Sequence, residues 1–147
     1  MNSPLFLPRG IRNNNPGNIR LSSAKWRGQR AVQTDIAFVE FESPLLGLRA
    51  LMVLLLTYYR RYDLDTVQSI INRYAPPHEN ATDHYAESVS KQLGVRRRQK
   101  LDLTRPDTLA GFARAIVKHE NGQEKERGDW YAPELYAQAA SLALGKE

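Results

Sequence analysis

The chain has 147 residues, a net charge of +5 and no cysteine. This length suits one domain whose core needs no covalent staple, and the lack of cysteine excludes disulfides, thiol nucleophiles and zinc sites built on thiolates. The positive charge favours an anionic partner such as nucleic acid, an acidic membrane surface or an acidic cell-wall polymer, without choosing among them. The three histidines show no metal-ligand spacing, so no metal site is expected.

The N-terminal part of the chain, residues 9–43, is rich in Asn, Gly and Ser and lacks a helical period. Residues 37–42 alternate apolar and polar side chains, which is typical of a half-buried strand. Residues 25–28, Lys-Trp-Arg-Gly, offer a partner strand and a turn, so we predict a small β-hairpin. We expect residues 1–8 to be flexible and see no secretion signal in them, because no basic leader precedes an apolar run.

Helical signals begin at Ser43-Pro44, a capping residue followed by proline at the first helical position. We predict a helix over Pro44–Arg61. Its most apolar part, Leu45–Leu56, is interrupted by Arg49 and is shorter than the roughly 20 residues of a bilayer span. This segment is therefore predicted to be a buried helix, and no membrane insertion is expected.

Shorter helices follow, each bounded by capping and stop residues. Proline cannot donate to the helical ladder, so Pro76-Pro77 ends the first of them. Apolar residues recur at helical spacing over 109–117, and the last helix is rich in alanine. With the capping residue first, the predicted ranges are Asp65 or Thr66 to Tyr74, Thr82 to Gly94, Asp107 to Gly122, and Pro133 to Leu144.

A basic run lies between the predicted helices, at residues 95–102. It contains Arg96, Arg97, Arg98 and Lys100. The simplest interpretation is a solvated connecting loop. Binding of a phosphate-bearing polymer is the alternative.

Glu120 is placed on the last turn of a predicted helix, after the apolar face formed by residues 109–117. Partial burial and the negative end of the helix dipole both disfavour the ionised carboxylate. A carboxyl group that stays protonated is what a glycosidase needs to protonate a departing glycosidic oxygen. Taken alone, however, a Glu on a last helical turn is more often simply solvated.

Two further segments carry polar groups suited to a binding cleft. The stretch Arg12–Arg20 contains three consecutive Asn residues, whose amides suit sugar hydroxyls and N-acetyl groups but also make turns and helix caps. The segment Tyr74–Tyr85 gathers tyrosines, histidines and carboxylates around a proline turn. It is either a helix-linking loop or a cleft wall.

These motifs, in this order, resemble a family of virion-associated peptidoglycan-degrading proteins of phages and prophages. They also resemble bacterial cell-wall N-acetylglucosaminidases of the lysozyme superfamily. The segments that match the phage family are Arg12 to Arg20, Trp26 to Gly28, Phe38 to Ser43, and Gly47 to Leu51. Those that match the glucosaminidases are Asn14 to Arg20, Trp26 to Gly28, Phe41 to Ser43, Tyr74 to Pro77, and Tyr85.

One element of the glucosaminidase pattern is out of place. In those enzymes the catalytic Glu lies on a helix before the Asn-rich stretch, whereas here no Glu precedes that stretch. The segment that matches the helix is Ala115–Gly122. We infer a circular permutation, which would place Glu120 beside the Asn-rich loop.

The resemblance implies an α+β, mostly helical, lysozyme-like single domain over residues 1–147, with a small β-hairpin lobe and a cleft. It implies Glu120 as the general acid, with Glu79 as the preferred auxiliary carboxylate. If the permutation is wrong, the candidate acids become Glu40, Glu42 or Glu79, and the first two share strand parity. The expected substrate-binding residues are Asn14, Asn15, Asn18, Tyr74 and Tyr85.

The implied activity is cleavage of peptidoglycan glycan strands, by a muramidase, a glucosaminidase or a lytic transglycosylase, with no cofactor or metal. The expected partners are peptidoglycan and other proteins of a virion or secretion machine, and we expect a monomer that binds no specific nucleic acid. Such a protein would reside in a phage virion or be delivered to the bacterial periplasm without a signal peptide. The alternatives are a non-catalytic glycan-binding or phage structural module and, resting on charge alone, a nucleic-acid-binding protein.

Overall fold

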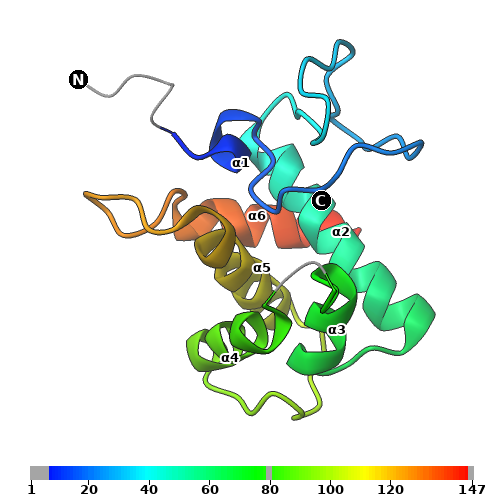
Figure 1. Ribbon diagram of the computed structural model, residues 1–147, viewed down its shortest axis with the longest axis vertical. Coiled ribbons are helices and arrows are strands. Elements are labelled where there is room, and N and C mark those ends of the chain that lie inside the picture. Colours follow the sequence, from blue (N-terminus) through cyan, green and yellow to red (C-terminus); the bar gives the residue numbers. More distant parts are fainter. Residues whose placement is uncertain (1–6, 79–80, 146–147) are drawn as a thin grey trace.

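Helices make up most of the regular structure in the computed structural model, which describes residues 7–78 and 81–145 (Figure 1). The helices are α1 (Arg9–Arg12), α2 (Pro44–Tyr62), α3 (Val67–Tyr74), α4 (Thr82–Leu93), α5 (Pro106–Asn121) and α6 (Pro133–Ala143). None of the helices in the described ranges is long and apolar enough to cross a membrane.

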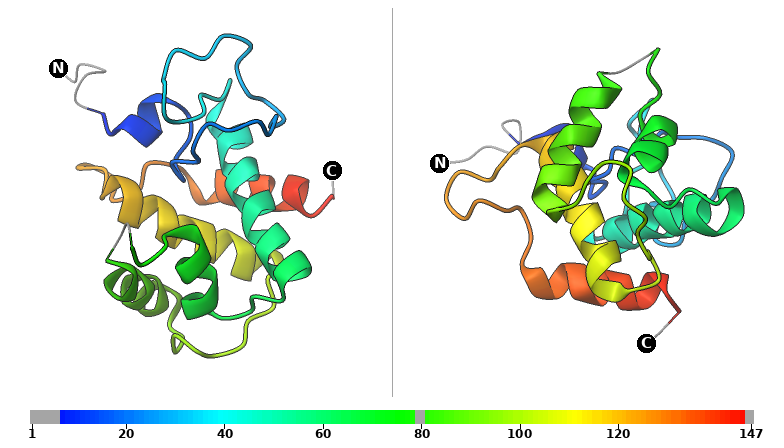
Figure 2. Two further views of the ribbon diagram at one scale, coloured as in Figure 1. Left: turned by 45° about the vertical axis from the view of Figure 1, so that its right-hand side comes forward. Right: turned by 90° about the horizontal axis from the view of Figure 1, so that it is seen from below.

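The long helix α2 organises the molecule. The Ser43 side chain accepts a hydrogen bond from the backbone N–H of Leu46, and Pro44 occupies the first turn, as the sequence predicts. Helices α5 and α6 pack against α2 and against each other, and α4 packs on α5 and α3. Figure 2 shows the N-terminal segment, in blue to cyan, over the first turns of α2 and α3 near its far end. The main apolar core fills the space between these helices.

The predicted helix ranges are confirmed to within a few residues, but two of the predicted caps are wrong. Thr66 forms the predicted cap of α3, as half of a capping box with Ser69. Helix α4 instead follows Ala81, and the Thr82 hydroxyl donates to the carbonyl of Ala75 at 2.5 Å. Helix α5 follows Arg105, so Asp107 lies in its first turn without capping it.

The predicted β-hairpin lobe is not present. Residues 20–43, all of them described, contain only two isolated bridges, Arg20 with Phe38 and Gln29 with Phe41. Backbone hydrogen bonds between residues 28–30 and 40–42 are present but do not extend into a ladder, and side-chain carboxylates take several of the neighbouring backbone donors. Asp35 accepts from the N–H groups of Ala37 and Phe38, and the buried Glu40 accepts from those of Thr34 and Asp35. The domain is therefore mostly helical, and the α+β class is corrected accordingly.

A second, smaller apolar cluster holds the N-terminal segment on α2. Its buried members are Ile19, Val39, Phe41 and Ala50. Gly47 of α2 lets the segment approach closely, because a Cβ there would lie 1.7 Å from the carbonyl oxygen of Asn14. Of the expected flexible residues 1–8, the first six lie outside the described ranges, and the carbonyl of Pro8 accepts the first hydrogen bonds of α1.

Candidate functional site

A cleft of about 670 Å³ opens where the N-terminal segment meets the helices. One wall comes from residues 17–20 and Phe38, and the other from α2, the end of α3 and the end of α5. The polar and aromatic side chains that line it belong to Asn18, Arg20, Phe38, Tyr58, Tyr74 and Glu120. Among the described residues lining this cleft, Glu120 provides the one carboxylate.

Glu120 is half-buried on the last turn of α5, and both of its carboxylate oxygens are engaged. Asn18 donates from Nδ2 to Oε1 at 2.8 Å, and the Tyr85 hydroxyl donates to Oε2 at 2.9 Å. The structure therefore places Glu120 beside the Asn-rich stretch, as expected. The two contacts fix the direction in which the carboxyl group faces the cleft.

Two tyrosines lie close to this carboxyl group: Tyr85 is buried, and Tyr74 is partly buried and lines the cleft. Their rings meet edge to face, with centroids 6.5 Å apart, and the Tyr74 hydroxyl donates to the carbonyl of Gly17. Burial raises the pKa of Tyr74 well above its usual value, and the charge of Glu120 adds to the effect. Burial likewise raises the pKa of Tyr85, with further contributions from Tyr74 and Glu120. Both hydroxyls therefore remain neutral hydrogen-bonding groups at any physiological pH.

The three predicted Asn residues have different roles. Asn18 reaches the cleft. Asn15 is fully buried and uses its side chain on the loop itself, donating to the carbonyls of Ile19 and Val39 and accepting from the Ile19 N–H. Asn14 adopts a left-handed conformation, with φ of 53°, and donates to the carbonyl of Phe41 at 3.1 Å. Asn14 and Asn15 therefore shape the loop and do not line the cleft.

Asn121, which follows Glu120, was predicted from the sequence only to help end the helix, but it also holds the candidate site together. Its buried side chain donates to the carbonyl of Pro16 at 2.8 Å and to that of Val117 at 3.0 Å. It thereby anchors the Asn-rich loop to the end of α5. Gly10 packs into the same place, because a Cβ there would lie within 2.8 Å of the side-chain oxygens of Asn18 and Asn121. The one clue to this contact in the sequence is that a polar residue directly follows the candidate acid.

His119 also escaped the sequence analysis. Its ring stacks on that of Tyr85, with centroids 3.7 Å apart and planes at 21°. Burial lowers the pKa of His119; the nearby Glu120 opposes this and His84 reinforces it. The imidazole therefore supports, in its neutral form, the tyrosine that donates to Glu120.

Glu40 and Glu42, the other described candidate carboxylates, do not line the cleft. Glu79 is outside the described residues. Glu40 is 6% exposed and serves the N-terminal loop; burial alone would raise its pKa, but hydrogen bonds from Asp35 and Thr34 and the charge of Arg30 lower it. Glu42 is exposed and does not line the cleft. Within the described ranges, no three His, Asp or Glu side chains form a group able to hold a metal ion.

The basic run at residues 95–102 is partly tied to the fold. The carbonyl of Arg97 accepts from the Gln68 N–H at 2.9 Å, and its guanidinium donates to Gln68 and lies 3.5 Å from Glu87. Arg96, Arg98 and Lys100 are exposed. A connecting loop anchored by Arg97 accounts for this segment.

No protein-family model matches the chain. It is similar to "Protein P5" of Pseudoalteromonas phage PM2, with 39% identity over 117 residues, which cover 78% of this chain and 71% of that protein. The predicted association with phages is confirmed at this level. Identity of this extent over most of both proteins shows that the chain belongs to the family of phage PM2 protein P5.

Proposed function

We propose that this protein cleaves the glycan strands of bacterial peptidoglycan, with Glu120 as the general acid. The observation that carries the proposal is the setting of Glu120: a half-buried carboxyl group in a 670 Å³ cleft, oriented by Asn18 and Tyr85. A cleft with aromatic side chains in its walls and one oriented carboxyl group suits a polysaccharide.

The two contacts of Glu120 are compatible with its protonated form. Oε1 goes on accepting from Asn18, while the proton resides on Oε2. The Tyr85 hydroxyl can rotate and accept that proton's hydrogen bond until a glycosidic oxygen replaces it. Glu120 then transfers the proton to this oxygen as the bond to the anomeric carbon breaks, and the electron pair of that bond leaves with the oxygen.

The second step needs a nucleophile for the cationic sugar. Ionised Glu120 can take a proton from water, which gives hydrolysis, or from a hydroxyl of the same sugar, which gives the anhydro product of a lytic transglycosylase. The described lining has no further carboxylate, which favours routes that use one acid. Glu79, three positions after the lining residue Pro76, is the proposed auxiliary group if a second carboxylate takes part.

Several features support this function beyond the site itself. The motif order resembles wall-degrading phage proteins and, with a circular permutation, glucosaminidases of the lysozyme superfamily. Membership of a phage protein family fits a protein that meets the cell wall as part of a virion. We therefore propose a virion-associated enzyme of lysozyme-like fold that reaches the periplasm with the particle or through a dedicated secretion route.

The test is digestion of purified peptidoglycan by the wild type, Glu120→Gln and a matched control, Glu126→Gln. Glu126 is exposed, six positions away, and does not line the cleft. Mass spectrometry of the released fragments identifies the bond that is cut, and anhydro or reducing ends identify the type of reaction. We expect the wild type and Glu126→Gln to release fragments and Glu120→Gln to release at least about 100-fold less.

Two results would contradict the proposal. Full activity in a folded Glu120→Gln variant would reduce Glu120 to a helix-end residue and return attention to Glu79, Glu40 and Glu42. If no version releases fragments but the wild type sediments with peptidoglycan, the protein is a glycan-binding module and not an enzyme.

A further inference from the structure

Arg20 places a positive charge in the cleft that pairs with no carboxylate among the described residues. Its backbone is held by the bridge to Phe38 and by hydrogen bonds on either side, from the Val39 N–H to the Ile19 carbonyl and from the Leu21 N–H to the Ala37 carbonyl. The guanidinium carbon lies 5.1 Å from the centre of the Phe38 ring. Phe38 and Arg20 both line the cleft that contains Glu120.

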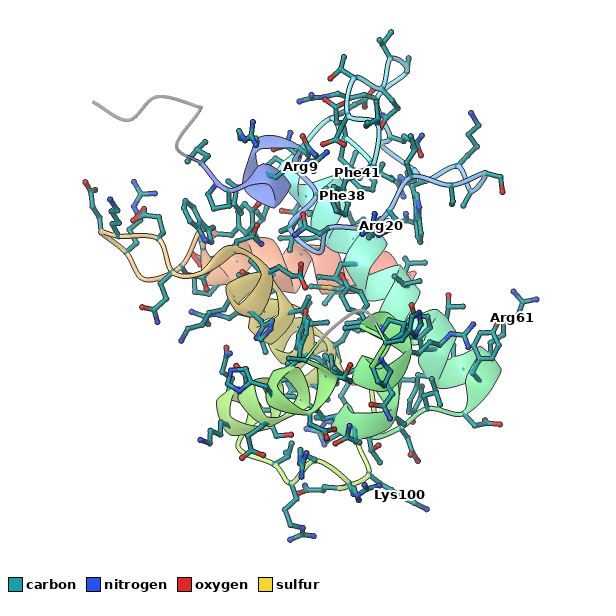
Figure 3. The ribbon with its side chains drawn as sticks, in the orientation of Figure 1. Arg9, Arg20, Phe38, Phe41, Arg61 and Lys100 are labelled. Carbon is teal, nitrogen blue, oxygen red and sulfur yellow. The ribbon has the colours of Figure 1, made fainter. Side chains whose placement is uncertain are left out.

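Arg9 lies against the same ring but, unlike Arg20, has a carboxylate partner. Its guanidinium carbon is 4.7 Å from the Phe38 ring centre, and its nitrogens donate to both oxygens of Asp35 at 2.6 and 2.7 Å. Arg9, with help from backbone N–H groups, holds the pKa of Asp35 far below its usual value. Both side chains are therefore ionised, and their opposite charges cancel within the pair. Figure 3 shows Phe38 with Arg9 and Arg20. Arg20 is exposed and pairs with no carboxylate among the described residues.

The charges of the cleft are therefore simple. Of the described residues that line it, Arg20 has the one basic side chain and Glu120 the one carboxyl group. A guanidinium presents paired N–H groups that match a carboxylate, and a ring behind it limits its movement. An uncharged glycan such as chitin offers this group no partner, whereas the peptide stems of peptidoglycan carry carboxylates.

We propose that Arg20, supported by Phe38, binds a carboxylate of a peptidoglycan peptide stem next to the bond that Glu120 cleaves. The inference rests on the proposed function and names the feature by which the cleft selects wall glycan over uncharged glycan. In intact peptidoglycan the sugar's own lactyl carboxyl group is already joined to the stem as an amide. The carboxylates available to Arg20 are therefore those of the peptide.

The experiment compares two substrates and four proteins. The substrates are purified peptidoglycan and the same material whose stem carboxylates have been converted to amides with a carbodiimide and ammonium. The proteins are the wild type, Arg20→Gln, Arg20→Lys and the control Arg12→Gln. Arg12 is an exposed residue of α1 that does not line the cleft, so its substitution removes the same charge elsewhere.

We expect Arg20→Gln to lower the initial rate on untreated peptidoglycan, at substrate concentrations below saturation, by about tenfold, which is typical of losing one charged hydrogen-bonded contact. Arg20→Lys should recover part of the rate and Arg12→Gln nearly all of it. On the amidated substrate, the wild type should fall to the level of Arg20→Gln. Equal losses by Arg20→Gln on both substrates, or no loss on either, would overturn the proposal.

Co-sedimentation with the same two substrates separates this inference from the proposed activity. If no protein cuts either substrate, the enzymatic proposal fails. The proposal that Arg20 binds a peptide stem is then still supported under two conditions. The wild type must sediment with untreated but not with amidated peptidoglycan, and Arg20→Gln must sediment with neither. If Arg20→Gln sediments like the wild type, the Arg20 proposal fails as well.

Discussion

Residues 13–43 and the helices that follow them keep their shapes by different means. In the helical part, a continuous apolar core holds the helices α2, α3, α4, α5 and α6 together. This core includes Leu55, Ile71 and Phe112. Residues 13–43, all of them described, contain no strand and a small apolar cluster, and side-chain amides and carboxylates bind the backbone directly. Regular structure is therefore not required for a well-defined segment, provided that its buried backbone groups find hydrogen-bond partners, whether on side chains or on other parts of the backbone.

The cleft lies on the boundary between these two regions. Asn18 and Arg20 come from the N-terminal segment, while Glu120 and Tyr85 come from the helices. The position of Glu120 relative to its neighbours consequently depends on how firmly the segment is docked. The following substitutions test whether the two regions differ in stability as they differ in construction.

The largest effect is expected from Phe112→Ala in the helical core. Phe112 is fully buried, and its loss should cost about 4 kcal/mol of unfolding free energy, measured by urea denaturation. Phe41 is equally buried but belongs to the small cluster of the N-terminal segment. Phe41→Ala should cost less, because a segment without regular structure can partly close the cavity. Equal costs would show that both regions are equally rigid.

Gly47→Ala should weaken the docking of the two regions. The new Cβ would lie 1.7 Å from the Asn14 carbonyl oxygen, so α2 and the Asn-rich loop must separate. We expect a loss of about 3 kcal/mol in unfolding free energy. The control is Gly111→Ala on α5, where the nearest atom is a methyl carbon of Leu93 at 3.2 Å and a helical Ala offsets the crowding. A neutral Gly47→Ala would contradict the close approach.

Asn15→Ala should loosen the N-terminal segment and leave the helices in place. The variant leaves the Ile19 and Val39 groups without their side-chain partner, at a cost of about 2 kcal/mol. Amide hydrogen exchange should rise in residues 16–41 and stay unchanged in α5. Asn14→Gly, which keeps the left-handed conformation and loses one bond, should change exchange far less. A uniform rise across the chain would mean that the two regions unfold as one unit.

The smallest effect concerns pH. Burial keeps the pKa of His119 below its usual value, so the unfolded chain takes up a proton there at a higher pH than the folded protein. The stability associated with His119 is therefore present above about pH 6.5 and is lost as the pH falls through the folded pKa. His119→Phe, which keeps the stack on Tyr85, should show a shallower fall in Tm between about pH 7 and about pH 5. An unchanged slope would indicate that other groups govern stability in this range.

The sequence predicted the helical part of the fold better than the N-terminal segment. Proline, capping residues and apolar spacing are local signals, and they located α2 and α3 closely. The alternation at residues 37–42 also looked local, but this segment makes backbone hydrogen bonds to two different parts of the chain, and the carboxylates of Asp35 and Glu40 bind backbone N–H groups beside it. The spacing of apolar residues specifies neither feature. The period-two pattern therefore correctly marked buried Val39 and Phe41 while failing to produce a hairpin.

The candidate site was predictable only in part. A family resemblance, and not any local pattern, led to the expectation that Glu120 lies near the Asn-rich stretch. The amides of Asn14 and Asn15 looked as suitable for sugars as that of Asn18, because the sequence does not show which of them faces the cleft. Arg20 and His119 depend on neighbours far away in the chain, Phe38 and Tyr85, so no local signal marked them.

The contact between Asn18 and Glu120 spans 102 residues, and that between Pro16 and Asn121 spans 105. A ribosome must therefore translate nearly the whole of α5 before Glu120 can meet the loop that orients it. A nascent or prematurely terminated chain that ends before α5 has the Asn-rich loop without Glu120. Such a fragment would therefore lack the contacts of Asn18 and Tyr85 with this carboxyl group.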